Sequence, residues 1–182
     1  YIGRANSQTT PARRALIANN MVTSTNDRAV YMFFPRDLDV YHNSFVSEAS
    51  AIVLSSFDNT TDNKNNIFVS YSLTNYAFET FSGVALQGMD HNVFYKNPAN
   101  PNLIDYGGFY TDLADWQANN TFGFGANSLQ GLPQFTSATD LHVDGAFLND
   151  MGVLTTVTTD IDGETRPAAG AASVDIGADE FT

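Results

Sequence analysis

Val40-Tyr-His-Asn-Ser-Phe45 is one of four similar blocks along this chain, and their spacing decides the fold. Each block carries an asparagine, then a variable residue, then an apolar residue. The asparagines are separated by 23, 23 and 26 residues; they are Asn20, Asn43, Asn66 and Asn92. The apolar residues two positions later are Val22, Phe45, Phe68 and Phe94. An alternation of period two that returns at a fixed, longer interval is typical of a solenoid built from strands.

We therefore predict a right-handed parallel β-helix, an all-β solenoid with about 23 residues per coil. Ala29–Phe34 and Ile52–Phe57 keep the same phase and predict a second strand per coil, and Leu38–Tyr41 predicts a third. The longer last interval predicts a bulge or a short insertion between Thr80 and Gly88. A β-sandwich or jelly roll is the alternative, since it also has short strands between turns, but it needs no fixed period.

Coils of such a solenoid stack about 4.8 Å apart, so equivalent side chains lie directly above one another. The four asparagines are then expected to form a ladder, because stacked amides can bond along the axis and asparagine tolerates the left-handed conformation of a tight bend. The four apolar residues are expected to form the inner stack.

The repeat fades after Phe94, and we expect three parts of a single domain. Residues 1–95 are assigned to coils, 96–131 to a loop and a short helix packed on the solenoid, and 132–182 to a C-terminal coil with capping strands. Thr111 is the expected N-cap of a helix that ends at Gln117, with Leu113 and Trp116 on its packed face. Further strands are expected around Leu132–Phe135, Asp140–Val143 and Val174–Phe181.

The composition is acidic and contains no cysteine. There are 20 acidic and 8 basic residues, for a net charge of -12. Such a charge disfavours nucleic acid and anionic membranes as partners, while cations, neutral glycans and basic proteins remain open. No apolar run approaches the roughly 20 residues that would cross a bilayer, so no membrane insertion is expected. The absence of cysteine excludes disulfides, a thiolate zinc site and a thiol nucleophile.

The end of the chain resembles a known group of proteins. Thr159-Asp-Ile-Asp-Gly-Glu-Thr-Arg-Pro167 and Asp175-Ile-Gly-Ala-Asp-Glu-Phe181 carry the most specific part of this resemblance. In this order, after Asn92–Tyr95, they resemble the C-terminal end of pectate-lyase-like β-helix proteins of the bacterial cell-surface "choice-of-anchor" kind. The resemblance implies export, to the cell surface or beyond, and a β-helix. It does not imply one activity, because one fold serves many functions.

Carboxylates on neighbouring coils raise the question of a calcium site. Asp37, Asp39, Asp58 and Asp62 fall on successive coils, and Arg13 and Arg36 are one repeat apart. Stacked carboxylates could bind Ca²⁺ beside a basic residue, as lyase chemistry requires. A solvated polar face is the favoured interpretation, because the sequence contains no contiguous calcium loop.

A second possible cation site lies in Asp160-Ile-Asp-Gly-Glu164. Asp160, Asp162 and Glu164 alternate like the start of a calcium loop, but the later ligands of that loop are missing. We favour a structural role in which Arg166 pairs with Asp162, Asp179 or Glu180 and fastens the end of the chain. His42 and His91 are expected to be isolated surface side chains, and no partner is evident for His142.

Aromatic side chains are the candidates for ligand binding. The most suggestive cluster is Asp105-Tyr-Gly-Gly-Phe-Tyr110, because its glycines leave Tyr106, Phe109 and Tyr110 accessible to a sugar. Other candidate rings are Tyr31, Tyr71 and Tyr76. Core packing is the competing role for these rings.

These observations support two hypotheses for function. The first is an exported, non-catalytic scaffold for surface adhesion or glycan binding. The second is the end of a polysaccharide lyase or glycoside hydrolase that acts on acidic polysaccharide. No acid/base pair is evident, which favours the first. We also expect upstream coils, another chain or a second copy to cover the edge strands near Tyr1–Val22, because an open solenoid end exposes unpaired backbone groups.

Overall fold

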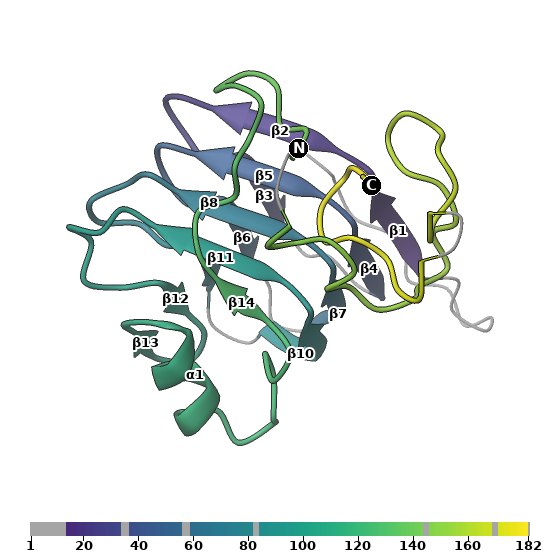
Figure 1. Ribbon diagram of the computed structural model, residues 1–182. Coiled ribbons are helices and arrows are strands. Elements are labelled where there is room, and N and C mark those ends of the chain that lie inside the picture. Colours follow the sequence, from purple (N-terminus) through teal and green to yellow (C-terminus); the bar gives the residue numbers. More distant parts are fainter. Residues whose placement is uncertain are drawn as a thin grey trace.

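The computed structural model describes residues 14–33, 37–55, 59–81, 84–143, 146–168 and 171–181. Over these ranges the chain is a parallel β-helix of about four coils with 23 residues between most equivalent positions (Figure 1). Each coil contributes one strand to each of three sheets. The pairings between coils are parallel, which confirms the solenoid and excludes the β-sandwich.

The three sheets are named here in the order in which the chain enters them. The first sheet contains β1 (Ala15–Ala18), β4 (Leu38–Tyr41), β7 (Asn59–Lys64) and β10 (Val84–Asp90). The second sheet contains β2 (Met21–Ser24), β5 (Ser44–Ser47), β8 (Ile67–Ser70), β11 (Val93–Lys96) and β14 (Leu129–Gln130). The third sheet contains β3 (Val30–Phe33), β6 (Ile52–Ser55), β9 (Phe78–Thr80), β12 (Ile104–Asp105) and β13 (Phe109–Tyr110).

The asparagine ladder forms as predicted at the corner between the first and second sheets. Asn20 Nδ2 donates to Asn43 Oδ1 at 2.8 Å, and Asn43 Nδ2 donates to Asn66 Oδ1 at 2.9 Å. The ladder continues from Asn66 Nδ2 to Asn92 Oδ1 at 2.9 Å, and Ser128 takes over the next position. Each inner amide also satisfies backbone groups at the bend, so the ladder holds successive coils in register.

The left-handed residue of each bend is not the ladder asparagine but the residue before it. These residues have φ between 53° and 56°; they are Asn19, His42, Asn65 and His91. The predicted conformational role of the ladder asparagines was therefore misplaced by one residue. Asparagine and histidine are among the side chains that tolerate this conformation best.

The apolar residues two positions after the ladder form the core, as predicted. Phe68 lies between Phe45 and Phe94, with ring centroids 6.2 and 5.6 Å away. All three rings are buried, and Val22 packs against them from the first coil. Burial of each phenylalanine contributes on the order of 2–3 kcal/mol, so the stack is a substantial part of the stability inside the coils.

β10 contains a one-residue bulge within the predicted stretch, but the longer interval before Asn92 arises earlier. Ser47 pairs with Ser70, 23 residues on, whereas Ile52 pairs with Phe78, 26 residues on, so the three extra residues lie between β8 and β9. Leu86 pairs with Thr61 and Gly88 with Asp62, so Gln87 is an extra residue in β10. A side chain at position 88 would come within 2.1 Å of Asp62 Oδ1, which explains the glycine there.

The third sheet has a register different from the predicted one. The sequence phase placed Ala29 opposite Ile52, but the structure pairs Val30 with Ile52. The observed register places Met32 and Leu54 together in the core, whereas the predicted one would have placed Met32 opposite Ser55. A slip of one residue reverses which face a side chain occupies, so burial of these two residues decides the register. The predicted strand ends, Phe34 and Phe57, lie outside the described residues.

Coils continue past residue 95, and a short helix covers their far end. β12 pairs with β9 and β14 with β11, so the region assigned to a loop and helix adds strands to two sheets. The helix α1 (Leu113–Asn119) begins one residue later than predicted, because Asp112 rather than Thr111 accepts from the Asp115 amide. Trp116 is fully buried and meets Phe94 edge-on at 5.9 Å, which confirms the predicted packing. The helix thus closes the core below the fourth coil (Figure 1).

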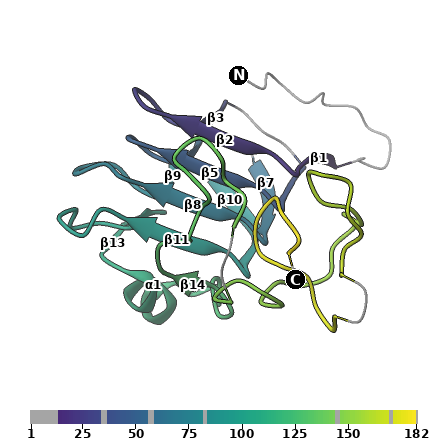
Figure 2. The same ribbon diagram turned by 45° about the horizontal axis from the view of Figure 1, so that its top comes forward.

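The last third of the chain is a strap across the outside of the second sheet, and here the prediction of capping strands was wrong. No strand forms among the described residues of 132–181; isolated bridges join Phe135 to Val143 and Thr159 to Thr165. Figures 1 and 2 show the green-to-yellow segment passing in front of β5, β8 and β11 and then along the ladder corner. Apolar side chains of the strap, including Leu141, Leu148 and Ile176, cover Ile67 and Val93.

Glycines let the strap approach the sheet closely. Gly177 has φ of 119°, and a Cβ there would come within 2.8 Å of Ile67 Cδ1. The same strap follows the left-handed corner residues coil by coil: Asn65 Nδ2 donates to Val153 O at 2.6 Å and Asn19 Nδ2 to Thr159 O at 2.7 Å. Side-chain amides of the solenoid corner thus satisfy backbone groups of the irregular strap.

A buried ion pair fastens the strap, as the sequence analysis predicted for Arg166. Its Nη1 donates to Glu180 Oε2 at 2.9 Å, and its Nη2 donates to Gly177 O at 3.1 Å. Both charged side chains are almost completely buried, with exposed fractions of 0% and 2%. Glu180 also accepts from the Asp175 and Ala168 amides. Each of the two motifs that carry the resemblance therefore supplies one side chain of this ion pair.

His42 lies beneath the strap, so the expectation of an isolated surface histidine was wrong for this residue. It is fully buried, and its Nε2 lies 3.2 Å from Thr155 Oγ1 and 3.0 Å from Asn65 Nδ2. Burial, followed by the nearby positive charge of Arg166, lowers the pKa of His42 from 6.5 to about 3. The imidazole is consequently neutral in the folded protein over the physiological range.

Replacement of His42 by asparagine is expected to reduce the acid sensitivity of folding. The folded pKa is depressed, so the contribution of His42 is complete above the unfolded pKa of about 6.5 and is lost as pH falls from there toward 3. Between pH 7 and pH 5 the free energy of unfolding of the native protein should fall by about 2 kcal/mol more than that of His42→Asn. Urea denaturation at both pH values measures this difference.

His91→Asn is the matched control, because His91 occupies the same corner position and its side chain is 22% exposed. It should keep the acid sensitivity of the native chain. Burial raises the pKa of Asp175 to about 6, so protonation of Asp175 stabilises the folded state as the pH falls. This contribution is present in all three proteins and cancels in the comparison. If His42→Asn and the native chain lose the same free energy of unfolding between pH 7 and pH 5, His42 is not the group that makes folding sensitive to acid.

No helix among the described residues has the length and apolarity needed to cross a membrane.

Candidate functional site

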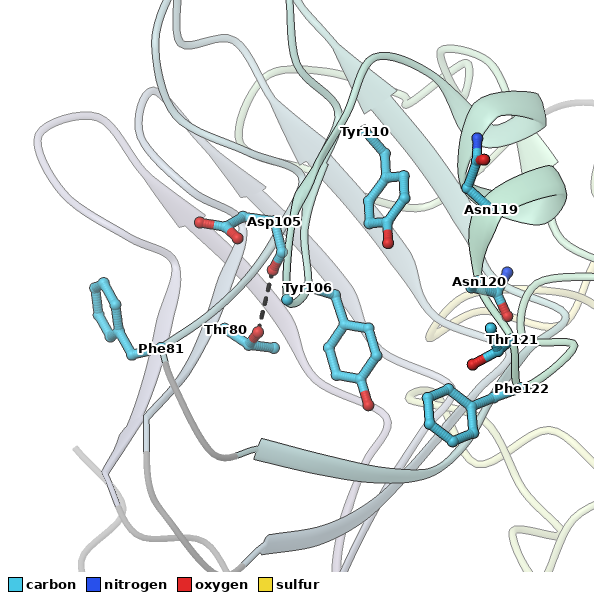
Figure 3. A pocket seen from close by; sticks show the side chains of 10 residues that line it. Thr80, Phe81, Asp105, Tyr106, Tyr110, Asn119, Asn120, Thr121 and Phe122 are labelled. Atoms are coloured by element: carbon cyan, nitrogen blue, oxygen red, sulfur yellow. Dashed lines mark hydrogen bonds between the residues drawn. The ribbon is translucent and has the colours of Figure 1, made fainter.

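A pocket of about 600 Å³ lies where the third sheet meets the end of α1 (Figure 3). The β12–β13 hairpin supplies Tyr106 and Tyr110, two of the three rings that the sequence nominated. Gly107 turns the hairpin with φ of 65°, and the Tyr106 amide donates to Gly108 O at 3.0 Å. This volume falls in the range of small-molecule sites.

The opposite wall of the pocket comes from the residues that follow the helix. Asn120 ends α1 and holds the next turn, because its Nδ2 donates to Trp116 O at 2.7 Å and its Oδ1 accepts from the Phe124 amide. Phe122 is 68% exposed and stacks on Phe124 at 5.4 Å. In Figure 3 the Tyr106 and Tyr110 rings stand between the strands on one side and Asn120, Thr121 and Phe122 on the other. Flat rings and amide groups thus share one accessible space.

Phe109, the third nominated ring, does not line this pocket. It pairs with Asp105 across the hairpin and therefore lies on the face of the third sheet that points away from the core. There it is 65% exposed and stacks on Tyr76, with centroids 5.9 Å apart and planes within 5°. The hairpin divides the nominated aromatic cluster between two surfaces.

A pair of carboxylates, not foreseen from the sequence, occupies the same outer face. Asp105 and Glu79 are neighbours in register on β12 and β9. Glu79 is buried and accepts from the Ser50 hydroxyl. Burial, followed by the charge of Glu79, raises the pKa of Asp105 above its usual value. Burial and the same two carboxylates also raise the pKa of Tyr76. This arrangement favours a proton held on one member of the pair.

The stacked carboxylates of the first sheet are paired with cations of the chain. Asp39 and Asp62 are neighbours in register, but Arg14 Nε lies 2.5 Å from Asp39 and Lys64 Nζ lies 2.9 Å from Asp62. Asp37 accepts from the Thr60 hydroxyl at 2.6 Å. Asp39 and Asp62 are thus ion-paired and largely buried, with side chains 18% and 13% exposed, whereas the sequence analysis favoured a solvated face. Asp58, Arg13 and Arg36 lie outside the described residues.

Asp160, Asp162 and Glu164 do not converge on a cation site. Asp160 is buried, and its two oxygens accept from the amides of Asp162, Glu164 and Glu180. It therefore shapes the turn and ties it to the end of the chain. Asp162 instead turns toward His142, whose Nε2 lies 2.8 Å from Asp162 Oδ2. The predicted trio is thus replaced by a different cluster.

That cluster contains His142, Asp162 and Asp179, with ligand atoms within 4.8 Å of one another. It is the one such group in the described part of the chain. Asp140 Oδ1 lies 2.5 Å from His142 Nδ1, on the other side of the ring. Hydrogen bonds to Asp140 and Asp162 raise the pKa of His142 to about 9. The sequence analysis named no partner for His142. Asp140 is two residues away and was a local signal that was missed, whereas Asp162 and Asp179 come from distant segments.

The chain matches no family model, no curated protein and no solved structure.

Proposed function

We propose that this chain is part of an exported surface protein in which the β-helix is a rigid scaffold that displays a glycan-binding pocket. The observation that carries the proposal is the pocket lined by Tyr106, Tyr110 and Phe122 beside Asn120. Aromatic faces and amides are the groups that bind the apolar face and the hydroxyls of a sugar. The resemblance of the last residues to bacterial cell-surface β-helix proteins supports the exported setting.

The charge of the protein narrows the class of glycan. A net charge of -12 repels polyuronates, and the carboxylates of Asp105 and Glu79 lie on the adjoining outer face of the third sheet. Neutral or amino sugars are therefore the expected ligands. Tyr106 and Tyr110 are held by the β12–β13 hairpin, and Phe122 follows the helix in a turn that Asn120 fixes through the Phe124 amide, which helps to position the rings before a ligand arrives.

Phe122→Ala is expected to weaken glycan binding about fivefold, since removal of one stacked ring costs on the order of 1 kcal/mol. Phe109→Ala is the matched control, because Phe109 is equally exposed but lies outside the pocket. Calorimetry with neutral gluco-, manno- and chito-oligosaccharides measures the binding, with polygalacturonate as the acidic comparison. Binding lost in Phe109→Ala but retained in Phe122→Ala would move the site to the outer face of the third sheet.

The carboxylate pair supports a second candidate function, that of a glycoside hydrolase or polysaccharide lyase. Asp105 with its raised pKa suits a general acid, and the neighbouring Glu79 suits a base. The protein is incubated with pectin, alginate and neutral glycans. Release of reducing ends measures hydrolysis, and a rise in absorbance at 235 nm measures the unsaturated product of a lyase. Product that disappears in Glu79→Gln would replace the scaffold proposal with an enzymatic one.

We further propose that another coil, from upstream sequence or a second chain, stacks on the edge strands β1, β2 and β3. Ile17 and Val22 are only partly buried, whereas Val40 and Phe45, their partners in register, are buried. A further coil would bury these side chains and pair the edge strands. Of the region Tyr1–Val22, residues 1–13 lie outside the described residues.

A further inference from the structure

Three segments of the strap meet at His142. The ring follows Leu141, which is buried against the second sheet. Asp162 comes from the turn that Asp160 shapes, and Asp179 comes from the last residues of the chain. His142 Nε2 and one carboxylate oxygen from each aspartate lie within 4.8 Å of one another. Residues separated by 20 and 17 positions are thus brought to one point by the fold.

The position of the imidazole suits a metal ligand. Asp140 Oδ1 lies against Nδ1 at 2.5 Å, which fixes the ring so that Nε2 points at the two other carboxylates. A carboxylate on the far nitrogen orients most metal-binding histidines in the same way. The polypeptide therefore holds both the ligand and the group that would tune it.

Asp179 supplies an independent indication. The residue is 9% exposed, and its one hydrogen bond in the described part of the chain is a long one, 3.3 Å, from the Val143 amide to Oδ2. No arginine or lysine among the described residues pairs with it; the nearby positive charge is that of His142, whose Nε2 is hydrogen-bonded to Asp162 instead. A carboxylate this buried normally has several donors or a cation beside it. Asp179 faces the same point as His142 Nε2, where a cation would neutralise it.

The ligand set decides the class of metal. One imidazole nitrogen and two carboxylate oxygens suit Zn²⁺ and similar first-row divalent ions, with ligands about 2.0–2.2 Å from the metal. Ligand atoms of a tetrahedral site lie roughly 3.4 Å apart. The three ligand atoms here lie within 4.8 Å of one another, with His142 Nε2 hydrogen-bonded to Asp162 Oδ2 at 2.8 Å, so a bound ion would separate this pair slightly and take the place of the proton between them. Calcium prefers six to eight oxygen ligands, so the Ca²⁺ considered from the sequence does not fit this cluster.

We propose that His142, Asp162 and Asp179 bind one first-row divalent metal ion of the Zn²⁺ class and that Asp140 orients the histidine. The ion joins the three segments and holds the end of the chain on the solenoid. Water or a partner group completes the coordination. This site lies on the strap and is independent of the glycan pocket and of any activity there.

The test is titration of the untagged, chelator-treated protein with Co²⁺ and Zn²⁺. Co²⁺ should give visible absorption bands that saturate at one ion per chain, and Zn²⁺ should displace it and raise the melting temperature. Asp140→Asn should weaken binding about 10–100-fold, as such orienting groups do. His142→Ala should abolish it, and Asp162→Asn, at a side chain 58% exposed, should do so without disturbing the fold.

His91→Ala is the matched control, because His91 also lies beside an aspartate, with Nδ1 3.3 Å from Asp90. It should bind Co²⁺ like the native chain. Millimolar Ca²⁺ should not compete. Absence of a saturable Co²⁺ spectrum, or a spectrum unchanged in both His142→Ala and Asp162→Asn, would overturn the proposal and leave His142 as an ion-paired clip.

Discussion

Replacement of Arg166 by methionine is expected to lower the free energy of unfolding by about 3–5 kcal/mol, because it leaves the Glu180 carboxylate buried without its cation. Methionine keeps most of the volume, so the loss is electrostatic rather than a cavity. The carbonyls of Gly177 and Asp175 lose their donor as well. Urea denaturation at pH 7 measures the difference, and proteolysis of the strap reports where the chain opens.

The pH dependence of this variant identifies the cause. In Arg166→Met the unpaired, buried Glu180 has a raised pKa in the folded state. The loss in free energy of unfolding is therefore complete above this raised pKa, shrinks as the pH falls below it, and disappears below the unfolded pKa of about 4.3. The double variant with Glu180→Gln should regain part of the loss at pH 7. Arg28→Met is the control, because Arg28 pairs with Asp27 at the surface and should cost under about 1 kcal/mol. If Arg166→Met also costs under about 1 kcal/mol, the buried ion pair does not fasten the strap.

The coils were predictable because they depend on a short pattern that repeats. Asn43 and Phe45 recur one coil later as Asn66 and Phe68, and stacking requires the same side chain to make the same contact at each level. Such a pattern predicts the ladder and the inner stack without any knowledge of distant contacts. Its accuracy ends where bend lengths differ, as between β2 and β3, where one additional residue shifts the register.

The strap could not be placed by periodicity, because it has none. A signal for its existence was nevertheless present: Ile67-Phe-Val69 is apolar on both faces of the strand, which predicts burial on both sides. Alternation alone assigned Ile67 to the outside and gave no reason to cover it. The covering segment is irregular and is held by Arg166 and by corner side chains such as Asn65.

The candidate sites were predicted only in part, because they join residues that are close in space but not in sequence. Tyr106 and Tyr110 were found from a local cluster with glycines, but Phe122 needed the position of the helix end. Phe109 was nominated with them because adjacent residues look equivalent in a sequence, whereas a hairpin sends neighbours to opposite faces. Glu79 had a weaker signal, as a charged residue directly after the buried Phe78.

Replacement of Asn66 by alanine is expected to destabilise the protein by about 3–4 kcal/mol, although it removes only one small amide group. The side chain is fully buried, its Nδ2 donates to Val40 O at 2.8 Å, and its Oδ1 accepts from the Asn43 amide at 3.1 Å. Alanine removes the acceptor of the Asn43 amide and one partner each of Val40 O, Asn43 Nδ2 and Asn92 Oδ1, in a place that water does not reach. Each such group costs about 1–3 kcal/mol, which exceeds the apolar gain from the smaller side chain.

Asn20→Ala is the matched control, because Asn20 has the same ladder position on the first coil but is exposed. Water can replace its partners, so this change should cost about 1 kcal/mol or less.

Asn66→Asp separates hydrogen bonding from packing, since aspartate has nearly the same shape but cannot donate when ionised. Its carboxylate would face Val40 O and Asn92 Oδ1, which are both acceptors, so the variant should be less stable than Asn66→Ala at pH 7. The folded pKa of this aspartate would be raised, so stability should recover as pH falls toward the unfolded value of about 3.9. Urea denaturation between pH 7 and pH 4 measures this recovery. If the difference in free energy of unfolding between Asn66→Asp and the native chain is the same at every pH, the amides fill space but do not hold the coils in register.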